Sequence, residues 1–255
     1  MLDPAVFDPT QHFDKAPSSV QNAILATLPE AEFGLFRPHL KPVPLKRNEI
    51  LQEALRYPDA AYFIESGVVS RVVRTVRDGP VEVAVVGKFG FVGVSLVLGT
   101  MQTIQRSVVR VPGSALRIEA DAFRDVLQRS PTIREHLLRY VQVLMALNMQ
   151  MALCNGRHEI GERVARWLLL AQDRIGSDRV PVTHSMIASA LGVRRPGVSK
   201  ALSELDAKRV IDGSRGAIRI RDLEGLRRNS CECERILRDR FRLIRDMPHH
   251  HHRFG

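Results

Sequence analysis

The pattern of apolar and polar positions first indicates a β-rich region over residues 42–118. Short runs of β-branched residues alternate there with glycines, as expected for strands joined by tight turns. Two of the runs, Val68–Val76 and Val81–Val86, flank Asp78-Gly79, which is the strongest short-range signal for a hairpin. Further strands are predicted at Tyr62–Glu65, Arg106–Val111 and Ala115–Ile118. Many short strands with glycine turns favour a jelly-roll barrel.

Helical spacing occurs before and after this region. Val20–Leu28 and Ala31–Leu40 precede it, and each has apolar residues three or four positions apart. After it, Asp121 is a candidate N-cap for a short helix over Ala122–Gln128. We therefore predict a first domain over 20–130, in which short helices flank a β-barrel.

A longer helix is predicted to begin at Ser130-Pro131, since Ser favours the N-cap and Pro the first helical position. It continues without Gly or Pro to Asn155-Gly156, which is predicted to break it and form a hinge. Its apolar residues recur at intervals of four, three and seven positions, which indicates the seam of a coiled coil. An Asn occupies the place missing from this repeat, and a single Asn in such a seam can fix the register of the two helices. The predicted dimerisation seam comprises Leu137, Val141, Leu144, Asn148 and Met151. We predict that this helix, over 131–155, pairs two copies of the chain; the alternative is a helix that packs only on its own barrel.

Residues 183–205 have the spacing of two short helices that meet at a steep angle. Thr183 is placed to cap the first helix. Ala188 is small where the helices cross, Gly192 takes a turn that needs a positive φ, and Val198 packs inside. These three residues are four and six positions apart, as a helix-turn-helix requires.

The second of these helices leaves a polar and cationic face outward. Arg and Lys can donate to guanine O6 and N7, and Ser can meet a base or a phosphate. The residues of this face are Arg194, Arg195, Ser199, Lys200 and Ser203. A hairpin with a glycine-rich tip follows over 210–220, and Arg215 at the tip either meets a phosphate or stays in solvent. With a preceding helix over Glu159–Asp173, these elements form a predicted DNA-binding domain over 159–228.

Charge and cysteine content agree with a DNA-binding protein of the cytoplasm. The formal net charge is +10, and residues 159–255 hold 20 Lys and Arg against 13 Asp and Glu, which indicates a polyanionic partner for the C-terminal part. Three cysteines are too few for a disulfide framework. The start of the chain lacks the features of a secretory signal. No apolar run is expected to reach the roughly 18 residues that are needed to span a membrane. A cytoplasmic location is therefore predicted.

The segment VTHSMIASALGVRRPGVSKALSEL, followed by VIDGSRGAIRIRD, resembles the winged helix-turn-helix of the Crp/Fnr family, named after the cyclic-AMP receptor protein and the fumarate–nitrate reduction regulator. The resemblance extends over about residues 20–225. It implies a homodimeric transcription regulator that binds double-stranded DNA and can contact RNA polymerase. The residues that it implies for DNA contact are Arg195, Ser199 and Lys200 at bases, and Thr183 and His184 at phosphates. Pro196 stands where many members have Glu, so the half-site of the best-known members is not expected.

The N-terminal segments RNEILQEALRYPDAAYFIESGVVS and GKFGFVGVSLVLG…QRSVVRVPGSALRI are similar to the cyclic-nucleotide-binding barrel of the same family. The effector site that this resemblance implies consists of Gly90, Gly93, Arg106 and Ser107. In it, Arg106 would hold a phosphate through its guanidinium. The acidic residue that meets a ribose hydroxyl in nucleotide-binding members is missing from Gly90-Phe91-Val92-Gly93, which disfavours a cyclic nucleotide. An effector of other chemistry and a barrel that binds no small ligand both remain open.

Other cofactors are disfavoured by the supply of ligands. An iron–sulfur cluster usually needs four thiolates, and this chain has three cysteines. No histidine lies between His39 and His136, so a metal or haem held inside the barrel is not expected. Cys154 is interpreted as a core thiol rather than a redox sensor. A metal site formed by Cys231-Glu232-Cys233 with His249–His252 is a weaker alternative, and the prediction is that the chain binds no metal.

These predictions combine into an α+β chain with an N-terminal jelly-roll barrel, a long dimerisation helix, a C-terminal winged helix-turn-helix domain and a last helix or tail over 229–255. A ligand-binding enzyme is the rival interpretation. It is disfavoured because a catalytic barrel would gather His and acidic residues, whereas the predicted barrel is rich in valine. Its acidic residues are scattered, with examples at Glu65, Glu82 and Glu119.

Overall fold

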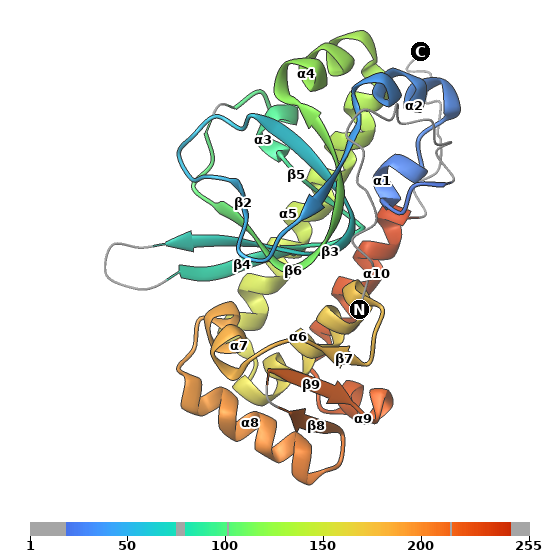
Figure 1. Ribbon diagram of the computed structural model, residues 1–255. Helices are drawn as coiled ribbons and strands as arrows, with labels where there is room; N and C mark the ends of the chain where they lie inside the picture. The colour runs from blue at the N-terminus through green and yellow to red at the C-terminus, as the bar shows by residue number, and fades with distance from the viewer. Residues whose placement is uncertain (1–18, 75–79, 101, 215, 246–255) are drawn as a thin grey trace.

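The computed structural model describes residues 19–74, 80–100, 102–214 and 216–245. A curled β-sheet with short helices forms the N-terminal half, and a smaller helical domain with its own sheet lies below it (Figure 1). Helix α5 (Pro131–Arg157) runs from one domain to the other, and α10 (Cys233–Arg245) packs beside it. The mixed α+β architecture predicted from the sequence is confirmed.

One antiparallel sheet of six strands builds the barrel. Its strands are β1 (Lys41–Leu45), β2 (Ile50–Gln52), β3 (Ala60–Arg74), β4 (Pro80–Val86), β5 (Phe91–Val92) and β6 (Arg106–Glu119). The main path runs β1-β6-β3-β4, while β2 pairs with β6 and β5 pairs with β3. The β3–β4 pair corresponds to the predicted hairpin, whose turn at Asp78-Gly79 lies outside the described residues.

Strands β3 and β6 are each longer than predicted, because both continue through a bend. The segments predicted as Arg106–Val111 and Ala115–Ile118 are one strand, β6, and β3 is likewise continuous. The pairing register between β3 and β6 shifts at the bend. Gly113 permits the close approach there, since a Cβ built on it would lie 2.2 Å from the carbonyl oxygen of Ser66. Bulges of this kind bend long strands, so the sheet curls on itself.

Two apolar cores stabilise the barrel. One is built from the strands alone and consists of Leu45, Ile64, Val69, Val86, Val92, Val109 and Ala115. The other lies between the sheet and its flanking helices and contains a cluster of aromatic rings. The ring centroids of Phe63 and Phe91 are 5.2 Å apart, and those of Phe91 and Tyr140 are 5.1 Å apart. Because Tyr140 belongs to α5, these ring contacts hold the long helix against the barrel.

Short helices precede, interrupt and follow the strands: α1 (Ala23–Ala26), α2 (Glu30–Phe36), the 3-10 helix η2 (Arg37–His39), α3 (Val94–Val97) and α4 (Ala120–Arg129). The helix predicted over Val20–Leu28 is shorter, because Asn22 caps it. The prediction that Asp121 caps α4 is wrong, since Glu119 holds the N-cap position. Asp121 instead lies in the first turn, where the helix dipole favours a carboxylate.

The long helix begins as predicted. Ser130 is its N-cap, and the Ser130 hydroxyl accepts a hydrogen bond from the Ile133 N–H at 3.1 Å. The predicted break at Asn155-Gly156 is wrong, since α5 continues through both residues and ends just before His158, whose backbone is extended. Glu159 then caps the next helix with a capping box. The turn between the two helices is therefore His158-Glu159.

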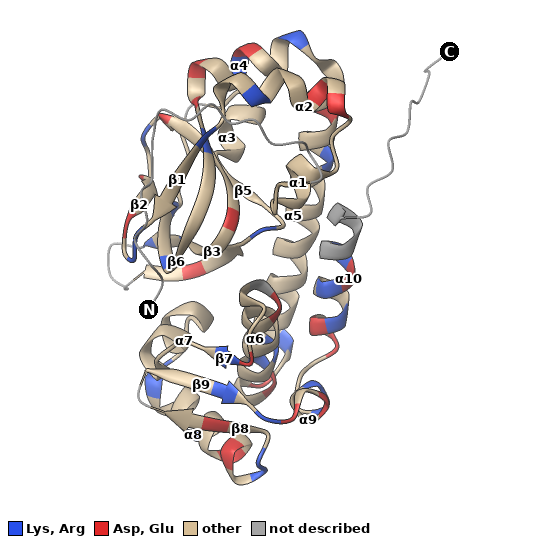
Figure 2. Cartoon of the chain, turned by 45° about the vertical axis from the view of Figure 1, so that its right-hand side comes forward, with Lys and Arg blue, Asp and Glu red and all other residues tan. Residues whose placement is uncertain are grey.

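Helix α5 is long and apolar enough to cross a membrane by length and composition, contrary to the prediction that no such run occurs. It has no Lys, Arg, Asp or Glu between Arg139 and Arg157, and Figure 2 shows it almost free of charged residues. One side of the helix packs on the barrel, and α10 packs along it as well. These contacts bury part of its apolar surface.

The C-terminal domain combines helices with a three-stranded antiparallel sheet in the order β7-β9-β8. Its elements are α6 (Ile160–Ile175), β7 (Arg179–Val180), α7 (His184–Leu191), α8 (Arg195–Ala207), β8 (Ile211–Ser214), β9 (Ala217–Ile220) and α9 (Leu223–Arg228). One core joins all of them and includes Leu168, Ile187 and Leu202. Helix α7 lies against β4 of the barrel, where the Ser189 hydroxyl donates to the Pro80 carbonyl at 2.9 Å.

Candidate nucleic-acid interface

Helices α7 and α8 meet in the predicted helix-turn-helix corner. Thr183 caps α7, and its hydroxyl accepts a hydrogen bond from the Met186 N–H at 3.2 Å. Gly192 ends α7 at a φ of +62°, a left-handed conformation that favours glycine. Ala188 and Val198 are buried, as the spacing predicted. The corner thereby fixes which side of α8 faces solvent.

The outer side of α8 is cationic over its N-terminal half. Arg194, Arg195 and Lys200 are exposed there, and within the described part of the chain no acidic side chain forms an ion pair with any of them. Ser203 is exposed on the same helix. Unpaired cations on an exposed helix are complementary to the phosphates and guanine edges that line a major groove.

The cations of the β8–β9 wing are paired, unlike those of α8. Arg219 on β9 donates to the Asp178 carboxylate at 2.8 Å, and this hydrogen bond lowers the pKa of the Asp178 carboxyl. Arg221, directly after β9, forms an ion pair with Asp212 on β8. These two cations of the wing, among its described residues, are therefore balanced by carboxylates. Arg215, predicted to meet a phosphate from the wing tip, lies outside the described residues.

His184 and Ser199 connect the two helices of the motif. The Nδ1 atom of His184 lies 3.0 Å from the hydroxyl oxygen of Ser199, and both side chains are half-buried. The resemblance implies a phosphate contact for His184 and a base contact for Ser199. A serine hydroxyl donates one hydrogen bond and accepts two, so this contact leaves Ser199 able to meet DNA. Thr183, the exposed N-cap of α7, directly precedes His184.

The predicted dimerisation seam of α5 is only partly buried in the protein. Leu137 is fully buried and Val141 is 8 % exposed, and both belong to the core between the helix and the barrel. Leu144, Asn148 and Met151 line a pocket at the junction of the two domains. The burial of Leu137 and Val141 contradicts this part of the predicted seam, whereas a dimer contact of Leu144, Asn148 and Met151 stays a prediction.

A different face of α5 is exposed. Leu138, Met145, Met149 and Leu153, here called the α5 stripe, are 38, 57, 64 and 50 % exposed. They are seven, four and four residues apart, a spacing that places them on one side of a helix. Large apolar side chains aligned along an exposed helix face are typical of a helix that meets a partner helix.

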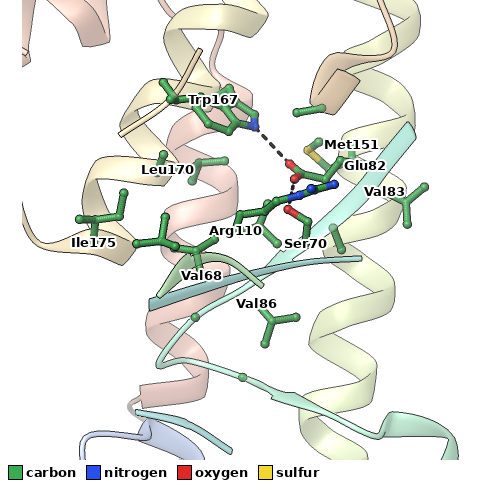
Figure 3. Close-up of a pocket in the computed structure, with 18 of the residues that line it drawn as sticks. Val68, Ser70, Glu82, Val83, Val86, Arg110, Met151, Trp167, Leu170 and Ile175 are labelled. Carbon is green, nitrogen blue, oxygen red and sulfur yellow. Dashed lines mark hydrogen bonds between the residues drawn. The ribbon is translucent and has the colours of Figure 1, made fainter. Parts of the chain in front are cut away.

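A pocket of about 280 Å³ lies between the barrel, α5 and α6 (Figure 3). Its lining is mostly apolar and includes Val68, Val83 and Val86 from the barrel and Leu170 and Ile175 from α6. The Glu82 carboxylate accepts a hydrogen bond from the Ser70 hydroxyl and another, at 3.2 Å, from Nε1 of Trp167. Arg110 from β6 lines the same pocket. A molecule in this pocket would touch both domains.

The residues predicted to bind an effector differ in their surroundings. Gly90 lines the inter-domain pocket, whereas Gly93 caps α3 at a φ of +111°. Arg106 forms an ion pair with Glu53 at 2.8 Å. Ser107 is fully buried, and its hydroxyl has no hydrogen-bond partner among the described groups. The phosphate-binding arrangement implied by the resemblance therefore stays a prediction, in which Arg106 would have to exchange Glu53 for the phosphate.

Two family models match the chain. The model of the cyclic nucleotide-binding domain matches residues 42–130, and that of the Crp-like helix-turn-helix domain matches residues 162–229. Together they span more than half of the chain, in the order of its two domains. The chain belongs to the Crp/Fnr family. It is a transcription regulator with a sensor domain of the cyclic-nucleotide-binding type and a helix-turn-helix DNA-binding domain, as the sequence predicted.

Solved Crp/Fnr regulators share the fold of this family member at low identity. A transcriptional regulator of the CRP/FNR family from Thermus thermophilus is 20 % identical, with a TM-score of 0.62, and covers 74 % of this chain and 97 % of that one. FixK2 from Bradyrhizobium japonicum is 17 % identical, with a TM-score of 0.61, over 75 % and 98 % of the two chains. The c-di-GMP-responsive global regulator CLP of Xanthomonas campestris is 15 % identical, with a TM-score of 0.63, over 74 % and 98 %. None of the curated proteins with which the chain was compared matches it.

Two features of this Crp/Fnr regulator are missing from the sequence-based predictions. Glu82 is interpreted there only as one of several scattered carboxylates, yet it links the barrel to α6. Cys154 is treated apart from Cys231 and Cys233, yet the three thiols are buried together, with His158 beside them. The sequence offered two signals, a Cys and a His four residues apart at 154 and 158 and a Cys-x-Cys motif at 231–233. Each is weak alone, and nothing in the sequence connects them, because Cys154 and Cys231 are 77 residues apart.

Proposed function

We propose that this Crp/Fnr regulator binds a two-fold symmetric operator as a homodimer in the cytoplasm. The observation that carries the proposal is the unpaired charge of Arg194, Arg195 and Lys200 on the exposed side of α8. The α5 stripe supports the dimer, because it offers an uncovered apolar helix face that a second copy can bury. The family resemblance also supports a contact with RNA polymerase at the promoter.

The direct test is selection of bound sequences from a random duplex pool by the full-length chain. We expect an inverted repeat with half-site centres about 10 base pairs apart, since two α8 helices related by a two-fold axis enter successive major grooves. Affinity should fall steeply with salt, because phosphate contacts release counterions. A selected pool without inverted repeats, bound no more tightly than shuffled sequences, would contradict operator reading.

We further propose that the inter-domain pocket receives the effector, and that this effector is a small apolar molecule with one anionic group. The lining is largely apolar, and Arg110 supplies a cation that forms no ion pair within the described residues. The pocket is walled by both domains, and Glu82 and Trp167 join them at its edge. A ligand that fits one arrangement of the domains better than another would shift their equilibrium.

Thermal unfolding in the presence of aliphatic carboxylates, with alcohols of equal chain length as controls, tests this pocket. We expect a stabilising carboxylate to add about 2.7 kcal/mol at a concentration 100 times its Kd, and the matching alcohol to add far less. Arg110→Met should abolish the response, whereas Arg47→Met, which removes an exposed arginine outside the pocket, should leave it intact. If no compound stabilises the chain and operator affinity never changes, the alternative of a barrel that binds no small ligand is favoured.

A further inference from the structure

Four potential metal ligands converge where the long helix ends. Cys154 lies in the last turn of α5 and His158 directly after the helix, and Cys231 and Cys233 lie just before and at the start of α10. The three cysteines are 0, 5 and 0 % exposed, and His158 is half-buried. One ligand atom from each side chain lies within 4.8 Å of the other three. None of the DNA-reading or effector proposals uses these residues.

We propose that these four side chains bind one Zn²⁺ ion in tetrahedral geometry. The Sγ atoms of Cys154 and Cys231 are 3.5 Å apart, and the Sγ atom of Cys233 is 3.5 Å from Nδ1 of His158. With Zn–S bonds of about 2.3 Å and Zn–N bonds of about 2.0 Å, a regular tetrahedron has S–S edges of about 3.8 Å and S–N edges of about 3.5 Å. The side chains therefore already stand near the spacing that one zinc ion imposes, and three thiolates with one imidazole form a common structural zinc set.

The spacing favours one ion over an iron–sulfur cluster. Cysteines that hold a cluster bind different iron atoms and stand further apart than ligands of a single ion, and such clusters usually take four protein thiolates. A disulfide between Cys154 and Cys231 would use two of the four groups and would leave Cys233 and His158 without a role. All three cysteines are free in the structure.

Buried positive charge around the cluster fits the charge of a zinc–thiolate centre. Arg166 is fully buried, its Nε and Nη2 atoms have no hydrogen-bond partner, and no carboxylate forms an ion pair with it among the described residues. Its guanidinium acts electrostatically on the thiols of Cys154 and Cys231. Three thiolates on Zn²⁺ leave one net negative charge, so the site would give this arginine a counter-charge that the described residues do not supply.

The site would fasten the junction between the two domains. Cys154 belongs to α5, which packs on the barrel, and Cys231 and Cys233 belong to the segment that follows α9 of the DNA-binding domain. His158 is itself part of the turn between α5 and α6. A bound ion would therefore restrict how the DNA-binding domain moves relative to the long helix. Gln150, whose Nε2 donates to Cys233 at 3.1 Å, supports the site from the next turn of α5.

Metal content and cobalt spectroscopy of the full-length chain test the proposal. The protein, purified under reducing conditions, is expected to hold one zinc per chain by elemental analysis. After chelation and titration with Co²⁺, it should bind one ion with thiolate-to-cobalt charge-transfer absorption and the visible bands of a tetrahedral ion, and Zn²⁺ should displace it. Cys231→Ser and Cys233→Ser should lose the ion, and Gln150→Ala should bind it about 10-fold more weakly.

Two control variants separate this site from other ways of holding metal. Replacement of all four residues His249–His252 by Ala and, separately, His39→Ala should each leave one ion per chain. Loss of the metal on replacement of the histidine run would overturn the proposal, and so would iron with labile sulfide in place of zinc. Absence of thiolate–cobalt bands in the reduced wild-type chain would also overturn it, a result that does not depend on how well the cysteine variants fold. The outcome does not affect the DNA-binding proposals, because those are tested by measuring affinity for operator DNA.

Discussion

Met149→Asp is expected to convert the dimer into monomers. Met149 is 64 % exposed in the chain and lies in the middle of the α5 stripe, so a two-fold axis through the stripe places the two copies of residue 149 near each other. An unpaired carboxylate in a buried apolar interface costs several kcal/mol, and a loss of about 4 kcal/mol weakens the dimer roughly a thousandfold. Sedimentation equilibrium over a range of protein concentrations measures this change, and operator affinity should fall with it.

Asn148→Asp is the matched control for this variant. It adds the same charge at an exposed position of α5, but Asn148 lies about 100° around the helix from Met149 and belongs to the seam predicted from the sequence. We expect it to remain dimeric. If Asn148→Asp dissociated the dimer and Met149→Asp did not, the seam predicted from the sequence would be supported and the α5 stripe would need another role.

Arg195→Ala should weaken operator binding by about 1–3 kcal/mol and should relax the base preference at one position of each half-site. Arg195 is exposed at the first turn of α8 and forms no ion pair within the described residues, so its guanidinium is free to bind a guanine edge through two hydrogen bonds. Titration of the wild-type and variant chains against operators with every base at each position measures both effects.

Arg209→Ala provides the comparison for charge alone. Arg209 is exposed just beyond the other end of α8, outside the cationic half of the helix. Its removal should reduce affinity for all sequences by a similar small factor and should leave the base preferences unchanged. An equal loss for Arg195→Ala on operator and on random DNA would show that Arg195 contacts phosphates and does not read a base.

The helix-turn-helix was predictable because its determinants are local. Ala188, Gly192 and Val198 lie within one short segment, and each fills a place that only a small, a glycine or an apolar residue can fill. The faces of α5 were not predictable in the same way. Between Arg139 and Arg157 the helix carries no charge, so several apolar stripes coexist, and only the position of the barrel decides which of them is buried.

The parts of the site that depend on distant contacts could not be derived from sequence either. Arg106 is available in the sequence for a phosphate, yet in the folded chain Glu53 from another strand region pairs with it. The link between Glu82 and Trp167 spans 85 residues and joins two domains, so neither residue carries a local signal for it. Such contacts follow from how the domains dock, which periodicity within one element does not encode.

The docking of α7 on β4 bears on the tendency of the protein to aggregate. Strand β4 is the last strand of the main sheet path, and its outward residues Val81 and Val83 are each 37 % exposed. Unpaired edge strands with apolar side chains recruit strands from other molecules. The hydrogen bond from Ser189 to Pro80 keeps a helix over this edge. Any movement that separates the DNA-binding domain from the barrel therefore also exposes the apolar edge of β4. Such a movement would promote aggregation, so it trades regulation against resistance to aggregation.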